Sequence, residues 1–248
     1  YNAGNDVTTG IKNTLIGGLA GDANTTGFNN IAIGYDSLGT NTAAGANIAI
    51  GYEALKTFNS TTNTSQFNTA VGTQAGKAVT TGIQNTLIGG LAGDALTDAN
   101  YNIAVGGQAL TADTLGSKST AVGFNTLADQ NFTSSTDTYN TGVGYNAGGA
   151  VTTGIRNTLI GSLSGDALTD ADFNVALGYN TLGADTLGSH NTALGYAALF
   201  AQNFTTATDS FNTAVGSNAG LSVNTGVKNT LIGGRAGDAL TDADYNVA

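Results

Sequence analysis

Hydrophobic and polar positions along the chain follow a five-residue unit that recurs from end to end. Each unit contains asparagine, or serine in one case, followed by two variable residues, an aliphatic residue and glycine. The units begin at Asn13, Asn30, Asn47, Asn68, Asn85, Asn102, Ser119, Asn140, Asn157, Asn174, Asn191, Asn212, Asn229 and Asn246. A few β-branched residues followed by glycine and small residues are typical of a short strand and a tight corner. The apolar stripe of period 3.6 that a helix needs is absent.

The spacing of the units is itself periodic. Successive units begin 17, 17, 21 and 17 residues apart, and the string NTLIG recurs every 72 residues. Such self-similarity indicates a repeat architecture in which each unit is one coil. We therefore expect an all-β fold, a parallel β-solenoid (β-roll or β-helix) with 17/17/21/17-residue coils. Residues 1–248 are expected to be a single repeat array, a fragment of a longer fibre, with 72-residue modules starting near residues 13, 85, 157 and 229.

The recurring asparagine predicts a structural ladder. In a solenoid, equivalent residues stack at the strand spacing of about 4.7–4.9 Å. Stacked asparagine side chains hydrogen bond to one another and to the backbone of the corner. The asparagines of the repeating units are therefore assigned an architectural role.

A second pattern occupies the residue directly before each unit, where aromatic residues alternate with polar or basic ones. The aromatic members are Phe67, Tyr101, Tyr139, Phe173, Phe211 and Tyr245. Rings roughly 9–10 Å apart, with a cationic or amide group between them, suit cation–π stacking. One interpretation is a stabilising surface or inter-chain stripe. The alternative is a repeating platform that contacts glycans of a host or neighbouring cell.

The 21-residue coils carry four additional residues each. The additions fall within the polar segments 56–67, 128–139 and 200–211, which we expect to bulge from the solenoid. Exposed, irregular segments on a rigid scaffold are the usual place for binding contacts. These segments are therefore candidate contact surfaces.

Composition narrows the classes of partner. The formal net charge is −10, with 17 acidic and 7 basic residues, so binding to a nucleic-acid backbone is not expected. No apolar run approaches the roughly 20 residues of a membrane-spanning helix, so no membrane contact is expected from this segment. The acidic segments 98–102, 166–174 and 238–246 are interpreted as a solvated edge, with calcium binding as the minor alternative.

Composition also argues against catalysis. The chain has one histidine and no cysteine, and its only glutamate is Glu53. Almost every aspartate is a periodic copy, whereas an active site is a unique constellation. We therefore expect no enzyme activity, no catalytic or metal-binding residues and no cofactor.

The short, alanine-rich coils enclose little apolar volume. A single chain would therefore gain little burial for each residue that it orders, and association of several chains would supply the missing core. From this we expect a homotrimer, so the chain's main partner is itself.

The repeats resemble those of two protein families. The strings NIAIG, NTAVG and STAVG are similar to the head repeats of trimeric autotransporter adhesins, whose heads are trimeric left-handed parallel β-rolls. The longer pattern NTAVGxxAG…TTGxxNTLIG resembles the repeats of bacteriophage tail-fibre proteins. Both resemblances imply an extracellular location, at a cell surface or on a virion.

The expected function is therefore the structural shaft of an extracellular attachment fibre, a phage tail fibre or a bacterial adhesin stalk. Two alternatives remain open. One is an adhesive module that binds glycans directly, and the other is a self-assembling extracellular matrix filament.

Overall fold

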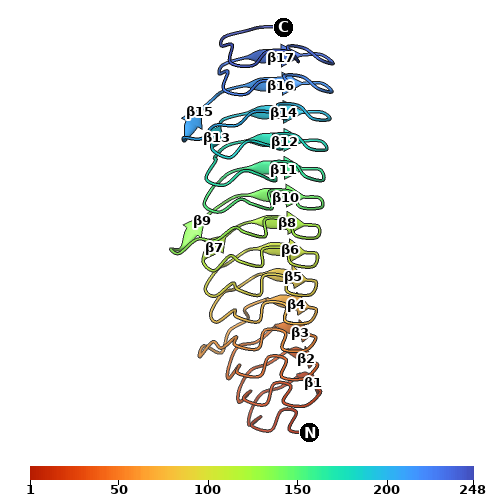
Figure 1. Cartoon of the computed structure of the whole chain (residues 1–248). Helices are drawn as coiled ribbons and strands as arrows, with labels where there is room; N and C mark the ends of the chain where they lie inside the picture. Colours follow the sequence, from red (N-terminus) through yellow and green to blue (C-terminus); the bar gives the residue numbers. More distant parts are fainter. The chain divides into compact units, whose positions relative to one another are not determined.

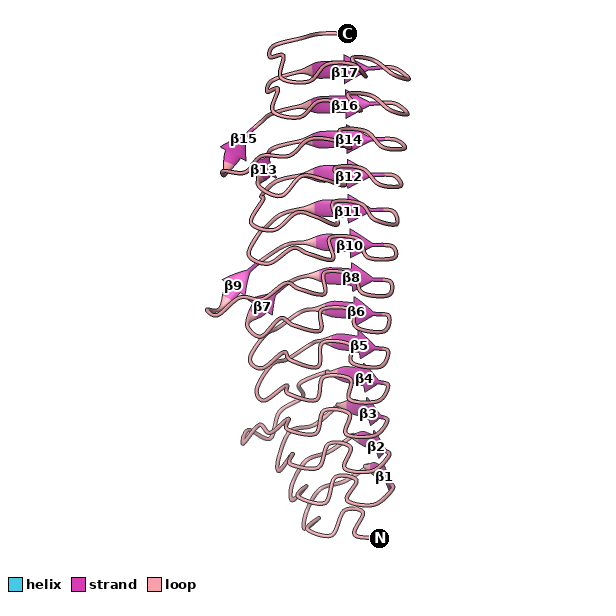
Figure 2. Cartoon of the chain, viewed as in Figure 1, coloured by secondary structure: helices cyan, strands magenta, loops and turns pink.

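The computed structural model describes all of residues 1–248, and the chain divides into two compact units. Unit 1 consists of Tyr1–Ser119 and Asn131–Asp137, and unit 2 consists of Thr120–Gln130 and Thr138–Ala248. Both units are built from short strands joined by turns (Figure 2). The chain contains no helix of the length and apolarity needed to cross a membrane.

Unit 1 is a stack of coils in which each coil contributes one strand to a parallel sheet (Figure 1). These strands are β1 (Thr14–Ile16), β2 (Ile31–Ile33), β3 (Ile48–Ile50), β4 (Thr69–Val71), β5 (Thr86–Ile88) and β6 (Ile103–Val105). Each pairs with the next in parallel, and the register joins equivalent residues of neighbouring coils. The shorter strands β7 (Gly116–Ser117) and β9 (Thr136–Asp137) form a separate parallel pair.

Unit 2 repeats the same arrangement. Its main sheet contains β8 (Thr120–Val122), β10 (Thr141–Val143), β11 (Thr158–Ile160), β12 (Val175–Leu177), β14 (Thr192–Leu194), β16 (Thr213–Val215) and β17 (Thr230–Ile232). Neighbouring strands again pair in parallel with equivalent residues opposite each other. A second parallel pair is formed by β13 (Gly188–Ser189) and β15 (Thr208–Asp209). The predicted all-β parallel β-solenoid is therefore confirmed.

Side-chain alternation along each three-residue strand separates the inside of the coil from the outside. The middle residue is half-buried in β1, the first strand, and buried in the other three-residue strands of both main sheets, as at Ala32, Leu87 and Ala176. The residues on either side of it point to the opposite face of the sheet, because successive side chains alternate. Leucines such as Leu96 and Leu168 fill the rest of the interior. Each coil therefore has a narrow core of alanine and leucine.

The glycine after each strand makes the corner. From Gly17 to Gly233, these glycines have φ between +125° and +142°, a conformation that other residues rarely adopt. A Cβ atom on Gly89 would lie 2.6 Å from the carbonyl carbon of Gly106 in the next coil. Glycine is therefore required both by the backbone conformation and by the closeness of the stacked corners.

Candidate interaction surfaces

The asparagine ladder is internal and its hydrogen bonds are satisfied within each unit. In unit 1, Oδ1 of Asn30 accepts a hydrogen bond from the backbone N–H of Asn47 (3.0 Å), and Nδ2 of Asn30 donates to the carbonyl of Ala44 (2.8 Å). In unit 2, Oδ1 of Asn157 accepts from the N–H of Asn174 (3.0 Å). These asparagines are buried. They hold successive coils in register and offer no free group to a ligand.

The residues directly before the asparagines all adopt left-handed backbone conformations, with φ between +50° and +64°. Positive φ is unusual for bulky residues such as Phe67 and Tyr101, and it persists where the surrounding structure holds the backbone. The N–H of Tyr101, for example, donates to the carbonyl of Ile83 at 3.1 Å. The six aromatic residues of the predicted stripe are between 40% and 69% exposed.

In unit 2 the stripe forms two stacked groups, one from Arg156 to Phe211 and one of Lys228 with Tyr245. The guanidinium carbon of Arg156 lies 5.2 Å from the ring centroid of Phe173. The His190 ring stacks between Phe173 and Phe211, with centroid distances of 4.7 and 4.9 Å. Lys228 lies 5.0 Å from the ring of Tyr245. Both faces of Phe173 are therefore engaged by the chain's own side chains, which supports a stabilising role for this part of the stripe.

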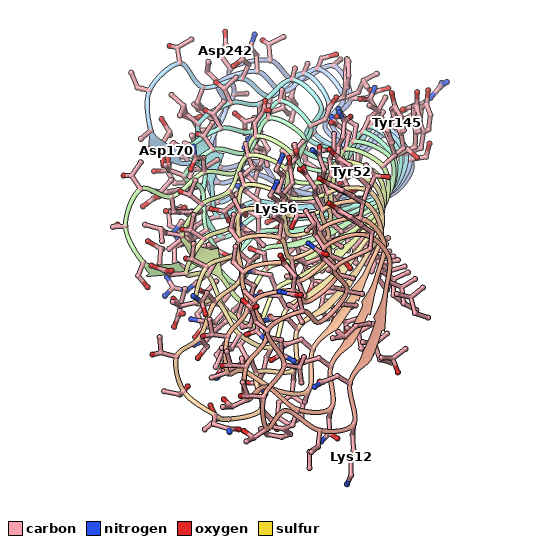
Figure 3. The ribbon with its side chains drawn as sticks, turned by 90° about the horizontal axis from the view of Figure 1, so that it is seen from below. Lys12, Tyr52, Lys56, Tyr145, Asp170 and Asp242 are labelled. Atoms are coloured by element: carbon pink, nitrogen blue, oxygen red, sulfur yellow. The ribbon has the colours of Figure 1, made fainter.

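A second aromatic row lies directly after the corner glycines; we call it the post-glycine row. Its members are Tyr35 and Tyr52 in unit 1, and Phe124, Tyr145, Tyr179 and Tyr196 in unit 2. They stack in three pairs, Tyr35 with Tyr52, Phe124 with Tyr145, and Tyr179 with Tyr196, at centroid distances of 5.8, 6.0 and 5.8 Å. All six rings are about half exposed, and the Tyr145 side chain projects outward from the ribbon (Figure 3).

Sequence reasoning did not identify the post-glycine row. The signal was present, because each ring directly follows the corner glycine as a Gly-Tyr or Gly-Phe pair. The predicted aromatic stripe lies directly before the asparagine of each unit, whereas the post-glycine row lies directly after the glycine. The structure brings these rings together because equivalent residues of adjacent coils stack.

The first and third residues of the strands form an outer sheet face in each unit. In unit 1 this face includes Ile88 and Ile103, which are 39% and 42% exposed. In unit 2 it includes Val175 and Leu177, which are 38% and 47% exposed. Rows of exposed aliphatic side chains on a regular surface are typical of interaction sites. The outer sheet face is therefore a partly exposed apolar surface in each unit.

Glu53 is the centre of an ion-pair network in unit 1. Its carboxylate lies 2.7 Å from Nζ of both Lys56 and Lys77, and it accepts a hydrogen bond from Gln74 at 3.0 Å. Lys56 also lies 2.9 Å from Asp36. The hydrogen bond from Lys56, followed by those from Lys77 and Gln74, lowers the pKa of Glu53 to about 2. The network links side chains of consecutive coils, so its role is structural.

The acidic segments also contribute hydrogen bonds between coils. Asp98 accepts hydrogen bonds from the hydroxyls of Thr80 (2.6 Å) and Thr81 (2.7 Å) in the preceding coil, and these bonds lower the pKa of the Asp98 carboxyl. In unit 2, Asp170 accepts from Thr153 at 2.6 Å and Asp242 from Thr225 at 2.8 Å. No group of three or more His, Cys, Asp or Glu side chains is arranged to hold a metal ion.

The insertion of residues 200–211 is anchored in unit 2. Phe204 is buried, and its N–H donates to Oδ1 of Asp185 at 3.2 Å. The same buried carboxylate accepts hydrogen bonds from Gly188 (3.1 Å) and Gln202 (2.5 Å). In contrast, residues 205–207 are exposed. The insertion therefore combines a fixed base with an exposed tip.

No ligand-sized cavity opens in the chain, so its candidate sites are surfaces. Comparisons with family models, curated proteins and solved structures find no match. The functional argument therefore depends on the surfaces described above.

Proposed function

We propose that this chain is the structural, non-catalytic shaft of an extracellular attachment fibre, in which three copies associate through their outer sheet faces. The observation that carries the proposal is the row of aliphatic residues that each unit exposes along its sheet. Three is the number of chains that the resemblance to autotransporter adhesin heads implies. The unbroken repetition of one coil supports a spacer role rather than a unique site.

The physical reason for association is the distribution of apolar side chains. The interior of each coil is filled mainly by alanine and leucine, whereas larger aliphatic side chains such as Ile33 and Ile50 lie on the outer face and are only half-buried. Removing apolar surface from water contributes about 25 cal/mol per Å². Packing these faces together would bury side chains that a single chain leaves in contact with water.

Sedimentation velocity on the full chain tests the association. We expect the sedimenting species to have three times the mass of one chain. The double variant Ile33→Lys with Ile50→Lys places two charges on the outer sheet face and is expected to give single chains. The matched control is Phe67→Lys with Gln84→Lys, which adds two lysines at positions where other coils already carry lysine. A wild-type chain that sediments as a single copy would contradict the proposal.

Electron microscopy distinguishes the proposed shaft from the alternative of a self-assembling matrix filament. A shaft segment is expected to form separate particles of uniform length. Open-ended polymers would instead support the matrix filament. The choice between a phage tail fibre and a bacterial adhesin stalk stays part of the proposal, and the coding sequence that follows residue 248 tests it: a trimerising chaperone domain supports the former and a membrane anchor the latter.

A further inference from the structure

The post-glycine row of unit 2 has one interruption. Tyr145, Ser162 and Tyr179 occupy equivalent positions in three consecutive coils, each directly after a corner glycine. Backbone hydrogen bonds join these coils at this point, from Leu163 N–H to the Tyr145 carbonyl (2.9 Å) and from Asn180 N–H to the Ser162 carbonyl (3.1 Å). A short serine side chain therefore lies between two coils that carry tyrosines. We call this place the Ser162 gap.

Each tyrosine beside the Ser162 gap has one ring face engaged on the side away from the gap. Tyr145 stacks on Phe124 and Tyr179 stacks on Tyr196. Tyr145 is nevertheless 58% exposed and Tyr179 is 50% exposed. The remaining exposed surface of the two rings flanks Ser162.

The same unit shows what fits between two rings that are two coils apart. In the aromatic stripe, His190 lies between Phe173 and Phe211, with centroid distances of 4.7 and 4.9 Å. Equivalent positions two coils apart are separated by roughly 9–10 Å along the stack in either row. One flat ring therefore fills this separation. At Ser162 the chain does not supply that ring.

We infer that the Ser162 gap binds the ring of a neutral hexopyranose sugar. The C–H face of a pyranose is apolar and packs on aromatic faces, while its edge carries hydroxyl groups. The three residues of the gap supply two aromatic faces and three hydroxyls, from the two tyrosines and the serine, and none of them is a carboxylate, an amine or a guanidinium. The chain's net charge of −10 disfavours an anionic ligand.

This inference is independent of the proposed shaft function. The Ser162 gap lies beyond the corner glycines, whereas association is proposed to use the strand residues that precede them. Sugar binding at this point would give the shaft an adhesive contact of its own. Loss of sugar binding and loss of association are therefore separate outcomes.

Saturation-transfer NMR on the full chain tests the site. The probes are the methyl pyranosides of glucose, galactose, mannose and N-acetylglucosamine, with tetramethylammonium as a cationic comparison. We expect saturation transfer to at least one sugar. Ser162→Tyr fills the gap with the chain's own ring, and Tyr179→Ala removes one wall. Each is expected to weaken binding at least tenfold.

The matched control is Ser217→Tyr. Ser217 follows Gly216 and adjoins the coil of Tyr196, but the next coil has Gly234 at the equivalent position, so no second ring flanks it. This variant is expected to leave sugar binding unchanged. Absence of transfer to all four sugars, transfer that survives Ser162→Tyr, or transfer to tetramethylammonium alone would each overturn the inference. Sedimentation of the same samples and their circular dichroism report whether fold and association are retained.

Discussion

Asn174 joins two coils through a single side chain. Its Oδ1 accepts a hydrogen bond from the backbone N–H of Asn191 (3.0 Å), and its Nδ2 donates to the carbonyl of Gly188 (2.9 Å). Both asparagines are buried. An amide side chain carries both a hydrogen-bond acceptor and a donor. Alanine has neither group, and an aspartate carboxylate has only acceptors. This explains why asparagine occupies the position in nearly every coil.

Replacement of Asn174 by alanine is expected to destabilise unit 2. The change leaves a buried N–H and a buried carbonyl without partners, which costs about 2–4 kcal/mol in the free energy of unfolding. Urea denaturation measures this loss. The control is Asn203→Ala, because the Asn203 side chain is exposed and accepts only one longer bond, from Thr186 at 3.3 Å. Equal losses for the two variants would contradict the ladder's structural role.

Gly89 and Gly90 are adjacent in sequence but differ in their tolerance of a side chain. Gly89 has φ of +137°, and a Cβ there would lie 2.6 Å from the carbonyl carbon of Gly106. A Cβ on Gly90 would meet nothing within 4 Å. We expect Gly89→Ala to lower the free energy of unfolding by about 2 kcal/mol or more and Gly90→Ala to change it by less than about 0.5 kcal/mol. Thermal and urea unfolding measure the stability of both variants. A Gly90→Ala variant as unstable as Gly89→Ala would contradict this prediction.

The lowered pKa of Glu53 predicts that the stability contributed by its ion-pair network depends on pH. Its pKa in the folded chain is lowered from 4.5 to about 2, chiefly by the hydrogen bond from Lys56. A lowered pKa means that the stabilisation is present above about pH 4.5 and is lost as the pH falls towards 2. The stability difference between the wild-type chain and Glu53→Gln is therefore expected to shrink over this interval. Urea midpoints at pH 7, 4.5, 3 and 2 measure it, and a difference that stays constant would argue against the network.

Phe204 anchors the insertion of residues 200–211. Its side chain is 6% exposed, whereas Phe200 in the same segment is 36% exposed. Phe204→Ala is expected to cost about 3–5 kcal/mol and to increase cleavage of the insertion by protease. Phe200→Ala is the control and is expected to have a smaller effect on both measurements. Similar cleavage of the two variants would show that the base of the insertion is not held by Phe204.

The repeat in the sequence predicted the fold class and the coil lengths correctly. A parallel stack places identical positions next to one another, so the intervals of 17 and 21 residues between asparagines are also the offsets between paired strands. The asparagines, such as Asn30 and Asn47, also predicted the register of the paired strands, because equivalent positions lie side by side in a parallel stack. The same stacking brings together the rings of the post-glycine row, which was not predicted, and the structure adds that these rings lie about half exposed on the surface.

The sequence by itself determined the length of each coil and which residues of neighbouring coils stack on one another. The reason is that a parallel stack of repeats places equivalent residues side by side. Only the tertiary structure decided which side of each strand faces inward. Hydrophobicity alone favours burial of the isoleucines, yet Ala32 is buried while Ile31 and Ile33 lie on the outer face. The reason is alternation: Asn30 and Ala32 lie two residues apart on the same side of the chain, so burial of the ladder asparagine also turns the middle strand residue inward and leaves the first and third residues outside.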